Sequence, residues 1–105
     1  MLKTLVIIPA FNEAENLRIL LPRLKQEAAA IQADILAIDD ASSDATLEIL
    51  QENEIKSISH IIQMGYGTTI QTGYKYALRN HYDCVIQLDG DAQHDPRFLP
   101  LFCMN

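Results

Sequence analysis

Short apolar runs alternate along the chain with longer stretches in which apolar residues recur every three or four positions. The runs are continuous and rich in β-branched residues, which is typical of strands buried on both faces. The third run, "SISHIIQ", is weaker because serines alternate with its apolar positions. The predicted strands are 5–11, 34–39, 57–63 and 84–89. The predicted helices between them are 12–32, 46–52 and 68–82.

Polar residues and a proline mark where the first two helices are expected to begin and bend. Asn12, with Glu15 three residues later, has the pattern of a capping box. The second helix is predicted to be capped by Asp44 or Ser43. Pro22 lies inside the first helix and predicts a kink or a shift in its hydrogen bonding there.

The predicted order is βαβαβαβ, followed by a helix that begins at Asp95 and Pro96 and continues to the end of the chain. Units of this kind form a mostly parallel sheet with right-handed crossovers and helices on both faces. The chain has no linker or repeat, so residues 1–105 are predicted to be one part of an α/β domain that is truncated after the fourth strand. An exposed sheet edge and a half-covered core would favour self-association.

The composition is that of a globular protein, with 49% hydrophobic and 21% charged residues among 105. A net charge of −6 argues against nucleic acid as a partner, and an anionic ligand would need a metal ion to bridge it. Cys84 and Cys103 form no CxxC pattern and are expected to be packing residues. No apolar run reaches the roughly 18 residues that span a bilayer, which favours a cytoplasmic chain.

Carboxylates gather after the ends of the predicted strands, where open parallel sheets bind their ligands. Asn12 and Glu13 follow the first strand. The acidic residues after the second and fourth strands are Asp39, Asp40, Asp44, Asp89, Asp91 and Asp95. Helix capping explains Asp44 and Asp95, whereas Asp40 could serve either a cap or a ligand.

The turn "LDGDAQHDP" brings Asp89 and Asp91 close enough for their charges to repel. A divalent cation would remove this repulsion, and oxygen-only ligands suit Mg²⁺ or Mn²⁺, which also bind the phosphate oxygens of substrates. Gly90 would let a ligand approach the backbone closely. His94, in the same turn, is expected to be solvated rather than a metal ligand, and His60 is expected to face solvent.

Four stretches carry a resemblance to a known family: "VIIPAFNEAENL", "AIDDASSDAT", "GYGTTIQTGYKYA" and "VIQLDGDAQHDP". With these, the chain resembles the family 2 type of GT-A glycosyltransferases, in particular those similar to dolichyl-phosphate mannosyltransferase and to bacterial polyprenyl-phosphate sugar transferases. The resemblance implies a GT-A fold and inverting transfer of a sugar from a UDP- or GDP-sugar to an acceptor such as a polyprenyl phosphate. It also implies Mg²⁺ or Mn²⁺ bound at the diphosphate. The implied role is in cell-envelope glycan biosynthesis, in the cytoplasm or at the cytoplasmic face of the membrane.

The resemblance assigns roles at the nucleoside end of the donor. It places Pro9, Phe11 and Glu13 around the nucleoside, and Ile38 and Asp40 at the base and ribose. Phe11 stands where many relatives have tyrosine, so it can pack against the nucleoside but offers no hydroxyl group. A carboxylate such as Asp40 can accept a hydrogen bond from a base N–H.

The resemblance also assigns the phosphate end. It places Asp89 and Gly90 at the ribose and diphosphate. The implied metal ligands are Asp91 and Gln93, with Asp89 binding directly or through water.

The chain departs from the family pattern in two ways. Gln63 and Tyr66 occupy the asparagine and lysine places of the family's Asn-x-Gly-Lys-Gly, so one phosphate partner is missing. The acceptor side of the domain is also absent. The catalytic residue is therefore unknown: a polyprenyl phosphate brings its own nucleophile, whereas the base for a hydroxyl acceptor would lie beyond Asn105.

Two other interpretations stay open. The chain could be a truncated, non-catalytic remnant that binds nucleotide or a protein partner. Alternatively, "GYGTTIQTG" superficially matches the G-x-G-x-x-G of dinucleotide-binding oxidoreductases, although Gly73 comes too late and the motif follows the third strand rather than the first.

Overall fold

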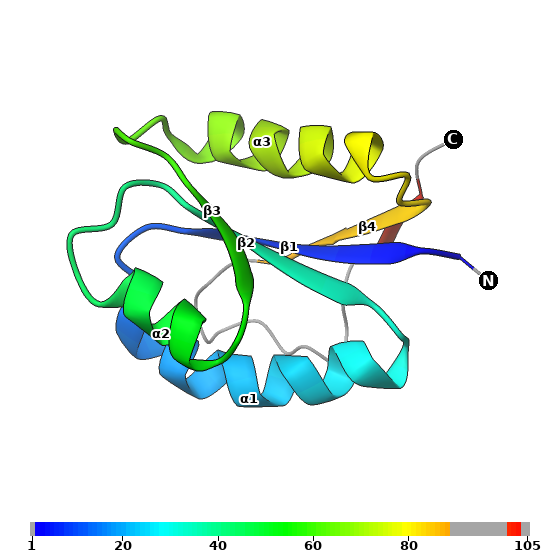
Figure 1. Ribbon diagram of the computed structural model, residues 1–105, viewed down its shortest axis with the longest axis horizontal. Coiled ribbons are helices and arrows are strands. Elements are labelled where there is room, and N and C mark those ends of the chain that lie inside the picture. Colours follow the sequence, from blue (N-terminus) through cyan, green and yellow to red (C-terminus); the bar gives the residue numbers. More distant parts are fainter. Residues whose placement is uncertain (1, 89–100, 104–105) are drawn as a thin grey trace.

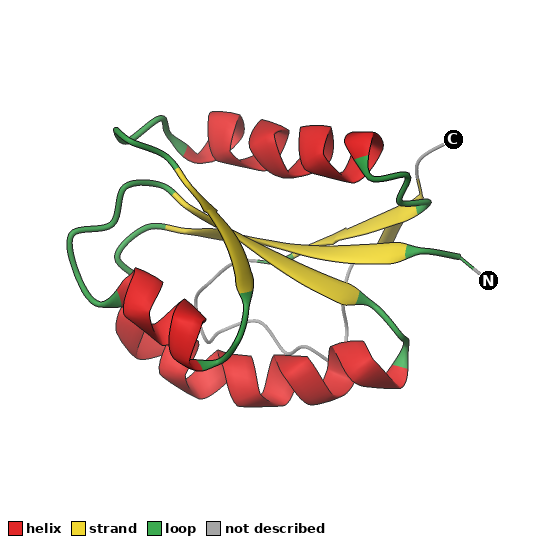
Figure 2. Ribbon diagram, in the orientation of Figure 1, coloured by secondary structure: helices red, strands yellow, loops and turns green. Residues whose placement is uncertain are grey.

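The computed structural model describes residues 2–88 and 101–103, the latter by their backbone alone. This part of the chain forms a twisted five-stranded sheet with helices on both of its faces (Figures 1 and 2). In chain order the elements are β1 (Thr4–Ala10), α1 (Ala14–Ala30), β2 (Asp34–Asp39), α2 (Thr46–Glu52), β3 (Lys56–Ser59), α3 (Tyr66–Arg79), β4 (Cys84–Gln87) and β5 (Leu101–Cys103). The predicted α/β class and the predicted alternation are confirmed.

The sheet has the strand order β3-β2-β1-β4-β5, with β1 to β4 parallel. The chain first moves from β1 towards β3, through α1 and α2, and then crosses back through α3 to place β4 on the other side of β1. The crossing direction therefore reverses between β1 and β4. In doubly wound sheets, ligands bind outside the carboxyl ends of the strands at such a switch point.

The end of the chain differs from the prediction. Leu101–Cys103 is a strand that pairs antiparallel with β4, not part of a helix, so the sheet continues past its fourth strand. Without this pairing the outer edge of β4 would present unpaired backbone groups, and a short apolar run satisfies them better as a strand than as a fragment of helix. The predicted helix start at Asp95 and Pro96 lies outside the described residues.

Alternate residues of the central strands form two separate hydrophobic cores. On one face Val6 and Ile8 of β1 pack with the buried leucines of α1 and with α2. On the other face Leu5 and Ile7 pack with Ala77 of α3 and with three partly buried tyrosines, Tyr74, Tyr76 and Tyr82. Figure 1 shows this layering, with α1 and α2 below the sheet and α3 above it.

The structure tests one of two local expectations. Helix α1 continues through Pro22 as one element of 17 residues, and the kink or shifted hydrogen bonding expected at this proline stays a prediction. Cys84 is buried in β4, as expected for a packing residue.

No helix within the described residues is long and apolar enough to cross a membrane.

Candidate functional site

The loops that follow β1 and β2 lie side by side at the carboxyl edge of the sheet. Ala10 pairs with Asp39 in the register of the two parallel strands. The next residue, Asp40, donates its N–H to the carbonyl oxygen of Ala10 at 2.8 Å. Phe11 and Glu13 on one strand end and Asp40 on the other are therefore brought to one edge, as predicted.

Hydrogen bonds join these two loops directly. The side-chain oxygen of Asn12 accepts the N–H of Ser43 at 2.8 Å, and the N–H of Asn12 donates to Ser42 Oγ at 2.9 Å. Asn12 holds a left-handed backbone conformation (φ 52°), which asparagine tolerates better than most residues. The predicted capping box with Glu15 is wrong, because the side chain of Asn12 bonds the neighbouring loop instead of its own helix.

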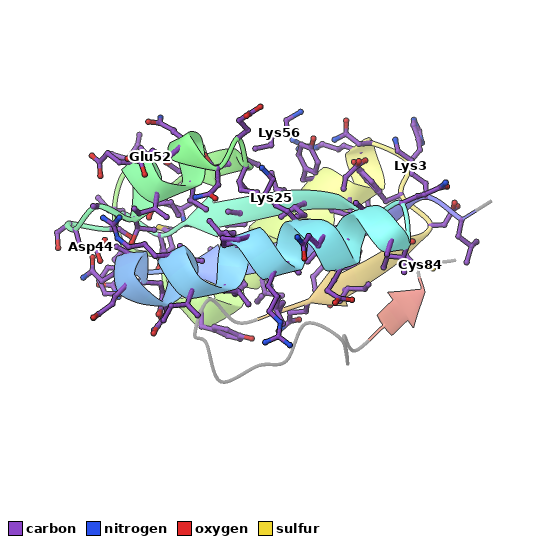
Figure 3. All side chains as sticks on the ribbon, turned by 90° about the horizontal axis from the view of Figure 1, so that it is seen from below. Lys3, Lys25, Asp44, Glu52, Lys56 and Cys84 are labelled. Atoms are coloured by element: carbon purple, nitrogen blue, oxygen red, sulfur yellow. The ribbon has the colours of Figure 1, made fainter. Side chains whose placement is uncertain are left out.

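The side chain of Asp44 bonds the first N–H groups of two of the helices that start at this edge, α1 and α2, from outside their N-cap positions Glu13 and Ala45. One carboxylate oxygen accepts the N–H of Thr46, the first residue of α2, at 2.9 Å. The other accepts the N–H of Ala14, the first residue of α1, at 3.3 Å. Thr46 Oγ1 in turn accepts the N–H of Glu13 at 2.9 Å. Figure 3 shows Asp44 at the end of the molecule where α1 begins. The predicted bond from Asp44 to the start of α2 is present, although Ala45 occupies the N-cap position, and a second bond reaches α1.

Replacing Asp44 by alanine is expected to lower the free energy of unfolding by about 1 kcal/mol, the usual effect of losing an N-cap side chain. Burial acts to raise the pKa of Asp44, but hydrogen bonds from Thr46 and from Ala14 outweigh it and lower the pKa below the ordinary value of 3.8. The stabilisation is therefore present above that value and is lost as the pH falls through the lower pKa of the folded state. Urea denaturation at pH 7 and at pH 3 should show a difference between the two proteins that shrinks in acid; a difference that grows in acid would contradict the capping role.

Asp40 is 4% exposed and anchors the loop between β3 and α3. Its Oδ1 accepts the N–H of Met64 at 2.8 Å, and its Oδ2 accepts the N–H of Gly65 at 2.9 Å. Burial acts to raise the pKa of this carboxyl, but a hydrogen bond from His60 and those from two backbone N–H groups outweigh it and lower the pKa. Asp40 is therefore ionised at neutral pH and holds the start of α3 against the end of β2.

His60 was expected to face solvent, and this expectation is wrong. Its side chain is 13% exposed, and its Nδ1 lies 2.8 Å from Oδ1 of Asp40. Its Nε2 lies 2.9 Å from Oγ1 of Thr72 in α3. Strand β3 ends at Ser59, so His60 is the first residue beyond the strand rather than a strand residue with an outward face. Since β2 and β3 are parallel neighbours, the shared edge was the signal that could have placed His60 beside Asp40.

The other residues predicted to contact the nucleoside differ in the exposure of their side chains. Phe11 is 38% exposed, and Glu13 is half-buried with one carboxylate oxygen accepting from Asn16 at 2.8 Å. Pro9 and Ile38 pair across β1 and β2 and are buried, with Ile38 in the core beneath α3. Ile38 thus supports this edge from inside, and its side chain does not reach the surface.

The predicted phosphate and metal residues, Asp89, Gly90, Asp91 and Gln93, lie outside the described residues. Within the part of the chain that is described, His, Cys, Asp and Glu side chains form no group of three or more that could hold a metal ion. The described edge therefore comprises the nucleoside end of the predicted site.

A groove of about 400 Å³ lies at the opposite end of the sheet, where β2 and β3 begin. Two of its polar side chains are hydrogen-bonded: Lys25 Nζ donates to the carbonyl oxygen of Asn53 at 2.7 Å, and Tyr82 donates its hydroxyl hydrogen to Asp34 at 2.6 Å. The groove lies at the opposite edge of the sheet from the switch point.

The strand order is that of a doubly wound α/β domain, a class in which ligands bind at the carboxyl edge beside the switch point. A model of the family described as glycosyl transferase family 2 matches residues 5–103. The chain belongs to this family, and the dinucleotide-binding alternative is set aside. Gly73 of the "GYGTTIQTG" stretch instead lets α3 pack against Ile7 of β1.

Individual relatives agree with this assignment. The undecaprenyl-phosphate mannosyltransferase of Micrococcus luteus is 31% identical over 104 residues, which cover 94% of this chain and 42% of the relative. The chain thus spans about two fifths of the length of that relative. Among solved structures, S. aureus TarS 1-349 in complex with UDP-GlcNAc has a TM-score of 0.73 and 25% identity, covering 86% of this chain and 27% of that TarS fragment. Mannosyltransferase PcManGT from Pyrobaculum calidifontis, in complex with GDP-Man and Mn²⁺, has a TM-score of 0.74 and 18% identity, covering 85% and 27% of the two chains.

Proposed function

We propose that residues 1–105 are the nucleotide-sugar-binding part of an enzyme that transfers a sugar from a UDP- or GDP-sugar to a polyprenyl phosphate. The observation that carries this proposal is the meeting of Phe11, Glu13 and Asp40 at one edge of the sheet, beside the switch point between β1 and β4. Membership of the family supports sugar transfer. The proposed acceptor is taken from the relative named for undecaprenyl phosphate. The proposed donors are taken from the similar solved structures that hold UDP-GlcNAc and GDP-Man.

The described residues would bind the nucleoside. The exposed ring of Phe11 offers an apolar surface for the base or ribose, and the half-buried carboxylate of Glu13 can accept from ribose hydroxyls. Asp40 is ionised and can accept from a base N–H. Pro9 and Ile38 would hold these residues in place from beneath.

The phosphate end of the donor would be bound by Asp89 and Gly90, with Mg²⁺ or Mn²⁺ held by Asp91 and Gln93 and by Asp89 directly or through water. These side chains offer only oxygen ligands to a metal, which suits both ions. A bound divalent ion offsets the charge that builds on the departing diphosphate.

The proposed transfer inverts the anomeric carbon. An oxygen of the acceptor phosphate attacks that carbon, the bond from the carbon to the diphosphate oxygen breaks, and the nucleoside diphosphate leaves with the electron pair. The acceptor is already an anion, so this step needs no protein base. A lipid acceptor would also place the enzyme at the cytoplasmic face of the membrane.

Calorimetric titration of the 105-residue chain with GDP-mannose and with UDP-GlcNAc tests the binding half of the proposal. We expect one of the two to bind in the presence of Mn²⁺ and to be released by EDTA. Failure of both nucleotide sugars to bind, by a chain that circular dichroism shows to be folded, would overturn the proposal. NAD as a third ligand is expected not to bind.

A further inference from the structure

His60 connects three elements at the nucleoside end of the proposed site. It follows β3, its Nδ1 lies 2.8 Å from Asp40 Oδ1 at the end of β2, and its Nε2 lies 2.9 Å from Thr72 Oγ1 in α3. Its own N–H donates to the carbonyl oxygen of Asp39 at 2.8 Å. Both ring nitrogens of His60 and its backbone N–H therefore have hydrogen-bond partners.

The hydrogen bonds of Asp40 show what this arrangement does to the carboxylate. An ionised carboxylate has about four acceptor positions, two on each oxygen. Oδ1 accepts from His60 and from the N–H of Met64, which fills it, and Oδ2 accepts from the N–H of Gly65. One acceptor position remains, on Oδ2. Because Oδ1 is held by two hydrogen bonds, the carboxylate cannot rotate to present Oδ1 to a ligand in place of Oδ2.

We propose that His60 is a positioning residue of the nucleotide site, which fixes Asp40 so that its Oδ2 faces the nucleobase with one acceptor position available. This inference rests on the proposed function, because it needs a base-contacting role for Asp40. His60 does not touch the nucleotide in this scheme. Thr72 secures the far side of the ring: its Oγ1 lies 2.9 Å from Nε2 of His60 and 3.1 Å from the carbonyl oxygen of Thr68, one turn earlier in α3.

The described structure also gives a reason why a histidine is needed here. The residue must hold a buried carboxylate on one side and a helix hydroxyl on the other, and imidazole is a rigid ring with nitrogens on both sides. Asparagine places its amide nitrogen near the position of Nδ1 and can keep the bond to Asp40, while it cannot reach Thr72. Alanine loses both bonds.

The test compares His60→Ala, His60→Asn and Thr72→Val in the 105-residue chain. His81→Asn is the matched control, because His81 is an exposed histidine at the other end of α3 whose left-handed backbone (φ 61°) asparagine tolerates. We expect His60→Ala to raise the Kd for the nucleotide sugar about tenfold or more, as for the loss of a charge-assisted hydrogen bond. His60→Asn should recover most of that loss, Thr72→Val should show a smaller one, and His81→Asn none.

Two further measurements separate positioning from general damage to the fold. Binding of inorganic pyrophosphate with Mn²⁺ probes the phosphate end alone and should be the same in His60→Ala as in the wild type. Amide hydrogen exchange by NMR, without nucleotide, should be about tenfold faster at Met64 and Gly65 in His60→Ala and unchanged at core amides of β1. If His60→Ala does not fold, Thr72→Val decides the matter: it should weaken nucleotide-sugar binding and leave pyrophosphate binding unchanged, and equal nucleotide-sugar binding by folded Thr72→Val and the wild type would overturn the positioning role.

The outcomes distinguish this inference from the proposed function. If the wild type binds nucleotide sugar and folded His60→Ala binds it equally well, the positioning role is overturned and the proposed function stands. Equal losses for pyrophosphate and nucleotide sugar would also overturn it, since they indicate damage to the whole edge. If the wild type binds neither nucleotide sugar, the proposed function fails, and the positioning role fails with it, even where exchange at Met64 and Gly65 responds to His60.

Discussion

Asp91→Ala is expected to abolish the Mn²⁺-dependent part of nucleotide-sugar binding, a loss of about a hundredfold or more in affinity. Asp91 is the residue that the family resemblance assigns most directly to the metal, together with Gln93. Charge-assisted contacts to a metal and its diphosphate contribute a few kcal/mol, and about 2.7 kcal/mol corresponds to a hundredfold change in Kd. The measurement is calorimetric titration with the nucleotide sugar, in Mn²⁺ and again in EDTA.

The pattern across conditions matters more than the loss itself. In EDTA the wild type and Asp91→Ala should bind equally weakly, because the nucleoside contacts of Phe11, Glu13 and Asp40 are unchanged. Glu52→Ala is the matched control: it removes an exposed carboxylate from α2, at some distance from the strand ends, and should behave as the wild type in both buffers. Mn²⁺-dependent affinity that survives in Asp91→Ala would show that the metal is held elsewhere.

Gly73→Ala is expected to lower the free energy of unfolding by about 1–3 kcal/mol, the usual effect of overfilling a packed core. A Cβ atom at position 73 would lie 2.6 Å from Cγ2 and 2.8 Å from Cδ1 of Ile7. Ile7 is completely buried in the central strand, so its side chain has little room to move away. Alanine stabilises a helix by about 1 kcal/mol relative to glycine, which is less than the expected clash. Urea denaturation followed by circular dichroism measures the result.

Two variants isolate the clash from the helix propensity. Gly67→Ala lies in the same helix, where an added Cβ meets nothing within 4 Å, and should be neutral or stabilising by up to about 1 kcal/mol. Ile7→Ala combined with Gly73→Ala should be less destabilising than the sum of the single changes, since the two side chains compete for one space. Equal stability of Gly73→Ala and Gly67→Ala would contradict the close approach of α3 to β1.

The fold was predictable because its central strands, β1, β2 and β4, are largely buried and its helices are buried on one face. Continuous apolar runs and leucines at helical spacing are strong signals, and the alternation of elements dictates a parallel sheet. The strand at Leu101–Cys103 was missed for a physical reason. A run of a few apolar residues is compatible with a strand or with a helix, and here the open edge of β4, far away in sequence, decides between them.

The candidate site was predictable in place but not in detail. Parallel strands bring Glu13 and Asp40 to the same edge whatever their side chains do, and the structure confirms this. Which group bonds which depends on contacts between loops that local patterns do not contain. Asn12 and Glu15 fit a capping box, yet the hydroxyl and N–H groups of Ser42 and Ser43 were better placed for Asn12. His60 was misjudged for the same reason, since its partners Asp40 and Thr72 lie 20 and 12 residues away in sequence.

The central position of β1 has a consequence for how the protein is made. Strand β1 is synthesised before both of its neighbours in the sheet, β2 and β4, and Thr4 finds its partner in β4 only when Cys84 has been synthesised. Until then one side of an apolar strand carries unpaired backbone groups, which are open to association with other nascent chains. The protein is therefore open to aggregation during its translation between α1 and β4, and a chaperone that shields β1 in this interval is expected to raise the yield.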